Sequence, residues 1–154
     1  MTDSEQKFTD GEVALLHRLV DMIIPASDEY MLPSANEELI FADILRSAGA
    51  YQTTISSSLK ALEQICREKF DHDFIELEAN DRTVAVDSFR HDYQAGSDLI
   101  ATVAAQCYYR DDRIMAALDM ETRPPFPEGY SVDDGNWSLL DPVRNLSPIY
   151  RKVT

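Results

Sequence analysis

The chain of 154 residues carries 28 acidic and 14 basic side chains, a formal net charge of −14 at pH 7, and 44% of its residues are hydrophobic. This length and composition indicate a single soluble domain with a sizeable core, and the negative charge argues against nucleic acid and anionic membranes as partners because both repel it. No run of residues approaches the roughly 18 consecutive apolar positions of a membrane-spanning helix, so we expect no membrane insertion.

The first half of the chain shows three helical patterns. The first begins at a capping box formed by Thr9 and Glu12, and it ends at a proline-bounded loop over residues 25–33. A second helix is predicted over about 36–48, with the following glycine as its stop. A third is predicted over about 51–69.

The second half continues in the same manner. One turn is predicted at Phe74–Leu77, followed by a helix that Asn80 can cap and that carries Val84, Val86 and Phe89. A further helix opens at Gly96–Ser97, and Asp111 or Asp112 can cap a last short one. No segment alternates with a period of two for long enough to predict a strand. We therefore predict an all-α fold, a bundle of about five or six helices over residues 1–119.

Residues 120–154 differ from the bundle in composition. They contain five prolines, which remove amide donors, so we predict that this segment is an irregular arm rather than a helix. The arm is also too rich in large apolar side chains for a solvated tail. We predict that it belongs to the same domain and docks on a partner; packing on the bundle itself is the alternative.

The candidate interface residues are the large side chains of the arm and two tyrosines near the end of the bundle. For the tyrosine pair, one buried and one exposed ring is the simplest interpretation, and a junction between bundle and arm is the other. Trp137 is either an internal plug or an interface anchor. The predicted interface comprises Phe126, Tyr130, Trp137, Leu140 and Tyr150 with Tyr108 and Tyr109.

Motifs for common catalytic and cofactor-binding sites are missing from the sequence. The three histidines are scattered, no glutamate has a histidine three residues later, and the five glycines form no phosphate-binding loop. We therefore assign no catalytic, cofactor-binding or metal-binding residue. The two cysteines, Cys66 and Cys107, are expected to be buried thiols, or a disulfide if their helices pack side by side.

Four segments, taken in order, resemble a known family. The chain is similar to the gluconate 2-dehydrogenase subunit 3 family, the small subunits of flavin-dependent sugar and polyol dehydrogenases. The segments that carry the resemblance are Ile23–Asp28 with Leu32–Ala35 and the helix start after it, Phe74–Leu77, Cys107–Asp111, and Gly129–Trp137.

The resemblance implies a non-catalytic partner protein. It implies a large subunit of the glucose–methanol–choline (GMC) type that holds FAD, acts on a sugar, glycoside or polyol, and passes electrons to a cytochrome c or another acceptor. This chain would bind no cofactor and would support the folding, stability or export of that subunit. The substrate, the acceptor and the stoichiometry stay open.

Family members often begin with a twin-arginine signal, whereas the first eight residues here lack the order of a secretory signal. We therefore expect a cytoplasmic location; a periplasmic one would follow if a signal was removed or lies on the partner.

Two hypotheses of other classes compete with this one. The first is a free-standing enzyme that uses acidic residues such as Asp71, Asp73 and Glu76. The second is a scaffold or stress protein whose arm folds onto its own bundle. Copurification with a flavin-bearing protein would separate them from the accessory-subunit hypothesis.

Overall fold

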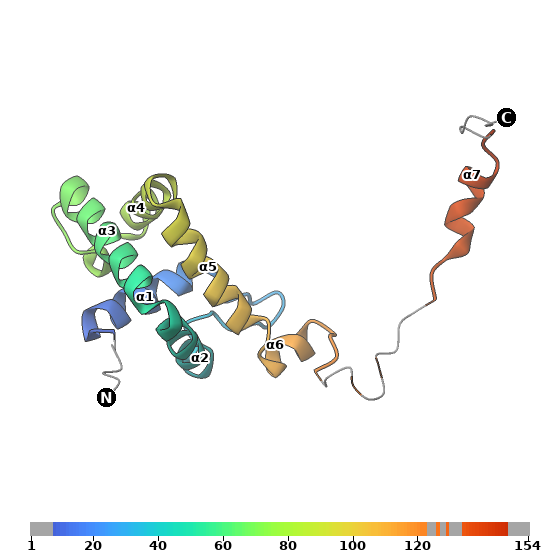
Figure 1. The fold of residues 1–154 in the computed structure, drawn as a ribbon, viewed down its shortest axis with the longest axis horizontal. Helices are drawn as coiled ribbons and strands as arrows, with labels where there is room; N and C mark the ends of the chain where they lie inside the picture. Colours follow the sequence, from blue (N-terminus) through green and yellow to red (C-terminus); the bar gives the residue numbers. More distant parts are fainter. Residues whose placement is uncertain (1–7, 123–125, 127–128, 130–133, 148–154) are drawn as a thin grey trace. The chain divides into compact units, whose positions relative to one another are not determined.

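The computed structural model (Figure 1) describes residues 8–122, 126, 129 and 134–147. This described part contains helices and one isolated β-bridge but no strand, which confirms the predicted all-α class. The chain divides into two compact units, residues 1–122 and 123–154. The helices of the first unit are α1 (Asp10–Ile23), α2 (Glu38–Ala48), α3 (Gln52–Phe70), α4 (Ala79–Asp92), α5 (Gln94–Tyr108) and α6 (Asp112–Ala117), with 3₁₀ turns η1 (Gly49–Tyr51) and η2 (Phe74–Glu76).

Helix α1 begins as its sequence predicts. The Thr9 hydroxyl accepts a hydrogen bond from the Glu12 amide at 3.2 Å, and the Glu12 carboxylate accepts one from the Thr9 amide at 2.9 Å. This reciprocal capping box satisfies two amides that the first helical turn leaves without a partner.

Helix α2 ends at Ala48 with Gly49 as its C-cap, which confirms the predicted stop. Gly49 has a right-handed backbone (φ −54°, ψ −35°) rather than a left-handed one, and it also opens η1. Helix α3 follows directly, so the chain changes direction by tightening into a 3₁₀ turn. The left-handed cap is found at the other end of α3, at Asp71 (φ 58°).

Helices α4 and α5 both begin earlier than predicted. Helix α4 is capped at Glu78 rather than Asn80, and Val84 is half exposed while Ala85 and Phe89 enter the core. Helix α5 begins at Gln94, so Gly96 lies inside it.

Helix α5 is the central element of unit 1, since it packs against α1, α2, α3 and α4. The core around it is apolar and draws on all six helices and on η2. Its fully buried large side chains include Leu16, Val20, Ile40, Ile44, Ile55, Leu59, Leu62, Phe74, Phe89, Tyr108 and Ile114.

The end of α5 and the start of α6 hold α2 and the loop before it. The Tyr108 hydroxyl donates to the carbonyl oxygen of Pro33 at 2.8 Å. Arg110 pairs with Asp43 on α2, and its Nη2 donates to the Ser47 hydroxyl at 3.0 Å. We call the region from Cys107 to Arg113 the α5–α6 corner.

Arg113 completes the α5–α6 corner. Its two terminal nitrogens donate to the two carboxylate oxygens of Glu37 at 3.1 and 2.9 Å, and it also pairs with Asp111, the cap of α6. Hydrogen bonds from Arg113 lower the pKa of both Glu37 and Asp111. Burial alone would raise the pKa of Asp43, but Arg110 beside it holds that pKa below its usual value.

The described part of unit 2 contains a short helical stretch, against the prediction that the arm has none. A 3₁₀ turn η3 (Trp137–Leu140) runs into one turn of helix α7 (Asp141–Arg144). Pro142 is compatible with α7 because it lies in the first turn, where an amide has no intrahelical acceptor to lose.

Gly96 is required by the close approach of α5 to α3, which gives a first prediction. A Cβ atom at Gly96 would lie 2.1 Å from the Ser58 Oγ atom and 2.9 Å from its Cβ atom. Because the Ser58 Cβ can move only with its backbone, Gly96→Ala is expected to lower the free energy of unfolding by about 1–3 kcal/mol.

Urea unfolding checks this value, with Gly49→Ala as the matched control. A Cβ at Gly49 meets nothing within 4 Å, so alanine there should leave stability unchanged or raise it by up to about 1 kcal/mol. Equal effects at both positions would contradict the close approach.

The carboxylates paired with Arg110 and Arg113, which are Asp43, Glu37 and Asp111, predict a loss of stability in acid. A lowered pKa contributes stability that is complete above the ordinary carboxyl pKa of about 4 and is lost as the pH falls through the folded-state value. The free energy of unfolding should therefore fall between about pH 5 and pH 3, and Arg113→Gln should flatten this fall because Glu37 and Asp111 lose their cation.

Urea midpoints measured across this pH range test the expectation. Arg18→Gln is the control, because Arg18 forms only an exposed pair with its helical neighbour Asp21. If Arg113→Gln and Arg18→Gln keep the same pH profile as the parent protein, the corner carries no acid-sensitive stability.

Candidate partner-binding surfaces

The helical stretch of unit 2 presents apolar side chains that its own unit does not cover. No residue of η3 or α7 is buried, and Trp137 and Leu139 are 69% and 73% exposed. The full set of large apolar side chains is Trp137, Leu139, Leu140, Val143 and Leu146. We call residues 137–146 the apolar segment.

Local hydrogen bonds give the apolar segment its shape without any core. The Asn136 side chain caps η3 by accepting from the Ser138 amide at 3.1 Å, and Arg144 pairs with Asp141 one turn away at 3.1 Å. Leu139 lies in η3, Val143 in α7 and Leu146 just beyond α7, and all three side chains are exposed. A short segment that exposes apolar side chains in this way is suited to docking on another protein.

The predicted interface residues have different positions. Trp137 and Leu140 belong to the apolar segment, and Phe126 is 84% exposed. Tyr130 and Tyr150 lie outside the described residues.

The two tyrosines of the bundle, Tyr108 and Tyr109, differ in burial. Tyr108 is 2% exposed and its hydroxyl is bound to Pro33, so its side chain is absent from the surface of unit 1. Tyr109 is 55% exposed, and its ring lies edge-on to that of Tyr108 with centroids 5.2 Å apart. The pair therefore consists of one buried and one exposed ring, which confirms the simpler of the two interpretations.

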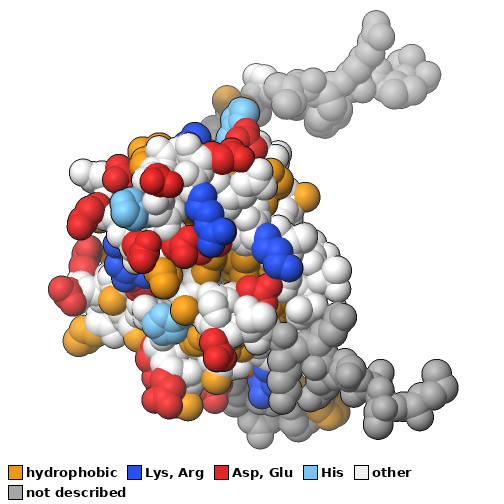
Figure 2. Space-filling view, turned by 90° about the vertical axis from the view of Figure 1, so that its left-hand side faces the viewer, with side chains coloured by type: hydrophobic (Ala, Val, Ile, Leu, Met, Phe, Trp, Pro, Cys, Tyr) orange, Lys and Arg blue, Asp and Glu red, His pale blue; other side chains and the backbone are white. Residues whose placement is uncertain are grey.

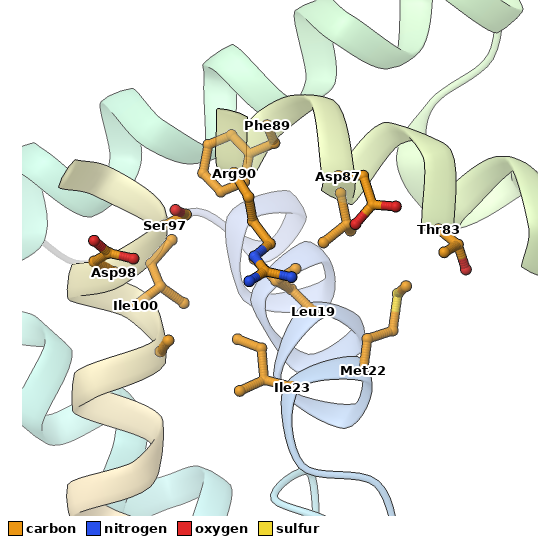
Figure 3. A pocket seen from close by; sticks show the side chains of 12 residues that line it. Leu19, Met22, Ile23, Thr83, Asp87, Phe89, Arg90, Ser97, Asp98 and Ile100 are labelled. Atoms are coloured by element: carbon orange, nitrogen blue, oxygen red, sulfur yellow. The ribbon is translucent and has the colours of Figure 1, made fainter. Parts of the chain in front are cut away.

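A pocket of about 480 Å³ lies between α1, α4 and α5 (Figure 3). Leu19, Phe89 and Ile100 form an apolar part of its lining, and the Arg90 guanidinium extends from α4 over it. Arg90 forms no ion pair with any residue that the structure describes, and Asp98 lies across from it on α5. The pocket contains no cysteine, histidine or other strong nucleophile or base beside its two aspartates.

The sequence gives little signal for this pocket. Met22, Ile23 and Val86 are only partly buried although each follows a helical apolar pattern, and their exposure results from the way three helices meet. Periodicity identifies the inner face of a helix, but it does not show where neighbouring helices leave a gap.

The acidic residues of the enzyme hypothesis take part in turn structure. Asp73 pairs with Arg67 at 2.8 Å, and the Glu76 carboxylate accepts from the Asp73 amide at 3.4 Å in a second capping box. Glu63 accepts from the Phe74 amide at 3.2 Å, and burial raises the pKa of Glu63. Within the described residues, no group of three or more histidine, cysteine or acidic side chains could hold a metal ion.

Charge on the described surface is mainly negative, and Figure 2 shows one face on which acidic side chains are spread among hydrophobic ones. No helix among the described residues is both long and apolar enough to cross a membrane.

Both cysteines are free thiols buried in unit 1. Burial, with the charges of Glu63 and Asp73, raises the pKa of Cys66 to about 12, and burial also raises the pKa of Cys107. The Cys107 Sγ lies 3.4 Å from the Ser47 hydroxyl. Thiols of this kind are poor nucleophiles because the thiolate is the reactive form.

The raised pKa values predict thiols that are unreactive in the folded protein. With a pKa near 12, the thiolate fraction of Cys66 at pH 8 is on the order of 10⁻⁴. Ellman's reagent should react rapidly with both cysteines only after unfolding in guanidinium. Ser57→Cys, on the exposed face of α3, is the positive control. A native cysteine that reacts as fast as this control would contradict the burial.

Comparison with known protein families matches residues 10–123 to the family described as Gluconate 2-dehydrogenase subunit 3. Searches of curated proteins and of solved structures returned no match. The matched range includes every helix of unit 1, with the α5–α6 corner and the loop that it holds. The chain therefore belongs to the gluconate 2-dehydrogenase subunit 3 family, whose members are named as subunits of a dehydrogenase complex.

Proposed function

We propose that this chain is a non-catalytic small subunit that binds and stabilises an FAD-dependent dehydrogenase of the GMC type. The large subunit holds FAD, oxidises a sugar, glycoside or polyol, and passes the electrons to a cytochrome c or another acceptor. The complex works in the cytoplasm. Family membership supports the place in a dehydrogenase complex.

The observation that carries the binding role is the apolar segment. Five large apolar side chains in ten residues are exposed, and neither η3 nor α7 has a buried residue. A surface of this kind is costly to leave in water and is typical of a protein interaction site. The tryptophan and leucine side chains give a partner apolar area to bury, and tryptophan is among the residues most enriched in binding hot spots.

The non-catalytic role is supported by the chemistry of unit 1. Its thiols are buried and its arginines at the α5–α6 corner are occupied with carboxylates of α2 and α6. These charged groups maintain the fold, so their geometry serves packing rather than the binding of a substrate. The acidic residues of η2 are likewise used as caps and ion-pair partners.

Copurification tests the proposal directly. The tagged full-length chain, expressed in its native cell, should retain a yellow protein whose absorption shows bound flavin. The flavoprotein expressed without the chain should lose solubility or activity. A flavoprotein that is equally soluble and active alone, or a chain that retains none, would overturn the proposed role.

Trp137→Ala should weaken the complex. A central interface tryptophan typically contributes 2 kcal/mol or more, which corresponds to roughly a thirtyfold or greater increase in Kd. The thermal midpoint of the isolated chain should stay unchanged because Trp137 is not part of a core within unit 2. Titration calorimetry or surface plasmon resonance with the flavoprotein measures the affinity.

Tyr51→Ala is the matched control for an exposed aromatic ring, since Tyr51 lies on η1 and is 50% exposed. It should leave the Kd unchanged. A Trp137→Ala protein that binds normally but melts many degrees lower would identify Trp137 as an internal plug.

A further inference from the structure

The loop between α1 and α2 is a small, well-defined hairpin. Ser27 and Leu32 exchange both backbone hydrogen bonds, at 2.9 and 3.0 Å, and the four residues between them form the turn. The Met31 amide donates to the Asp28 carbonyl oxygen at 3.3 Å and closes the turn. We call residues 28–31 the hairpin tip.

Met31 is unfavourable for the fold at this place. Its φ of 52° lies in the left-handed region, which glycine and asparagine adopt far more readily than a residue with a long side chain. Its side chain is 88% exposed, so no core packing compensates. A strained backbone that carries an exposed apolar side chain points to a requirement outside the folding of the chain.

The base of the hairpin is anchored to the rest of unit 1. The Ser34 Oγ lies 2.7 Å from a carboxylate oxygen of Asp21 and 3.1 Å from the Ile24 carbonyl oxygen, which also accepts from the Ala35 amide at 2.9 Å. The Tyr108 hydroxyl holds the Pro33 carbonyl oxygen from α5. A hairpin with an anchored base loses less conformational entropy on binding than a free loop would.

The side chains of the hairpin tip are those of an interface. Tyr30 is 58% exposed next to Met31, and aromatic residues and methionine are enriched in protein interfaces. Methionine is also flexible and polarisable, so it fills irregular apolar pockets well. Asp28 and Glu29 carry negative charge beside them and form no ion pair with any described residue.

We propose that the hairpin tip is a second docking element, which inserts Met31 and Tyr30 into an apolar pocket with a basic rim on the dehydrogenase subunit. The proposal rests on the proposed function for the identity of the partner. The basic rim follows from charge complementarity, since two uncompensated carboxylates flank the apolar pair on a chain of net charge −14. Unit 1 thereby contacts the partner independently of the apolar segment.

Met31→Asn and Met31→Gly test the proposal without loss of the fold. Both residues suit the left-handed backbone, so the thermal midpoint should stay unchanged or rise. The Kd for the copurified flavoprotein should increase at least about tenfold, the scale of a single apolar anchor residue. Ile75→Asn, at a large apolar residue on η2 that is 55% exposed, should leave the Kd unchanged.

Glu29→Lys tests the basic rim through the rate of association. Reversing one charge should slow association with the flavoprotein at low salt and weaken its dependence on ionic strength, with little effect on the melting temperature. Faster association would overturn the basic rim.

The outcomes separate this inference from the proposed function. A complex that weakens with Trp137→Ala but binds the Met31 variants normally would overturn the hairpin proposal alone. Failure of the full-length chain to bind any flavoprotein would overturn both.

Discussion

The architecture of unit 1 depends on the seven residues of the α5–α6 corner. Through this corner, the Tyr108 hydroxyl at the end of α5 binds the loop before α2, Arg110 pairs with Asp43 on α2, and Arg113 on α6 pairs with Glu37, the N-cap residue of α2. The three contacts differ in kind, because the tyrosine is buried whereas the arginines lie at the surface and form charge-assisted bonds. Apolar packing is non-directional, so by itself it would define the rotation of α2 about its own axis only poorly. The directional hydrogen bonds and ion pairs define that rotation, and the bond from Tyr108 to Pro33 also anchors the base of the hairpin.

The two units contribute differently to the proposed role. Unit 1 has an apolar core and satisfies its buried polar groups: no buried side-chain nitrogen or oxygen among the described residues lacks a hydrogen-bond partner. The described part of unit 2 has helical turns made by local hydrogen bonds, and none of its residues in those turns is buried. A stable body that carries an anchored hairpin, joined to this exposed apolar segment, suits a protein that completes another protein's surface. Two contacts linked through one chain raise the overall affinity through effective concentration.

The sequence predicted the helices well because their signals are local. The capping box at Thr9 and Glu12, the cap at Asp111 and the turn at Phe74 all depend on residues within a few positions of one another. The stop of α2 at Gly49 was predicted correctly, but the right-handed cap and the 3₁₀ turn that follows it depend on the packing of α3 and have no local signal. The helical turn at Pro142 was missed for a related reason: the sequence shows the proline but not its position in a first turn. The pocket and the strained Met31 require tertiary structure and have no local signal.

The long separation of Tyr108 from Pro33 has a consequence for biosynthesis. The two residues are 75 positions apart, and Arg113 and Glu37 are 76 apart. At 5–20 residues per second, a ribosome adds this interval in roughly 4–15 s. By the end of this interval α1, the hairpin and α2 have all been synthesised, whereas α5, which fixes them, is only just complete. Helices themselves form within microseconds, so synthesis sets the delay, and the apolar faces of α1 and α2 lack α5 until then. Closure of unit 1 is therefore a late event in translation, and a nascent chain stalled before α5 would expose those faces to chaperones.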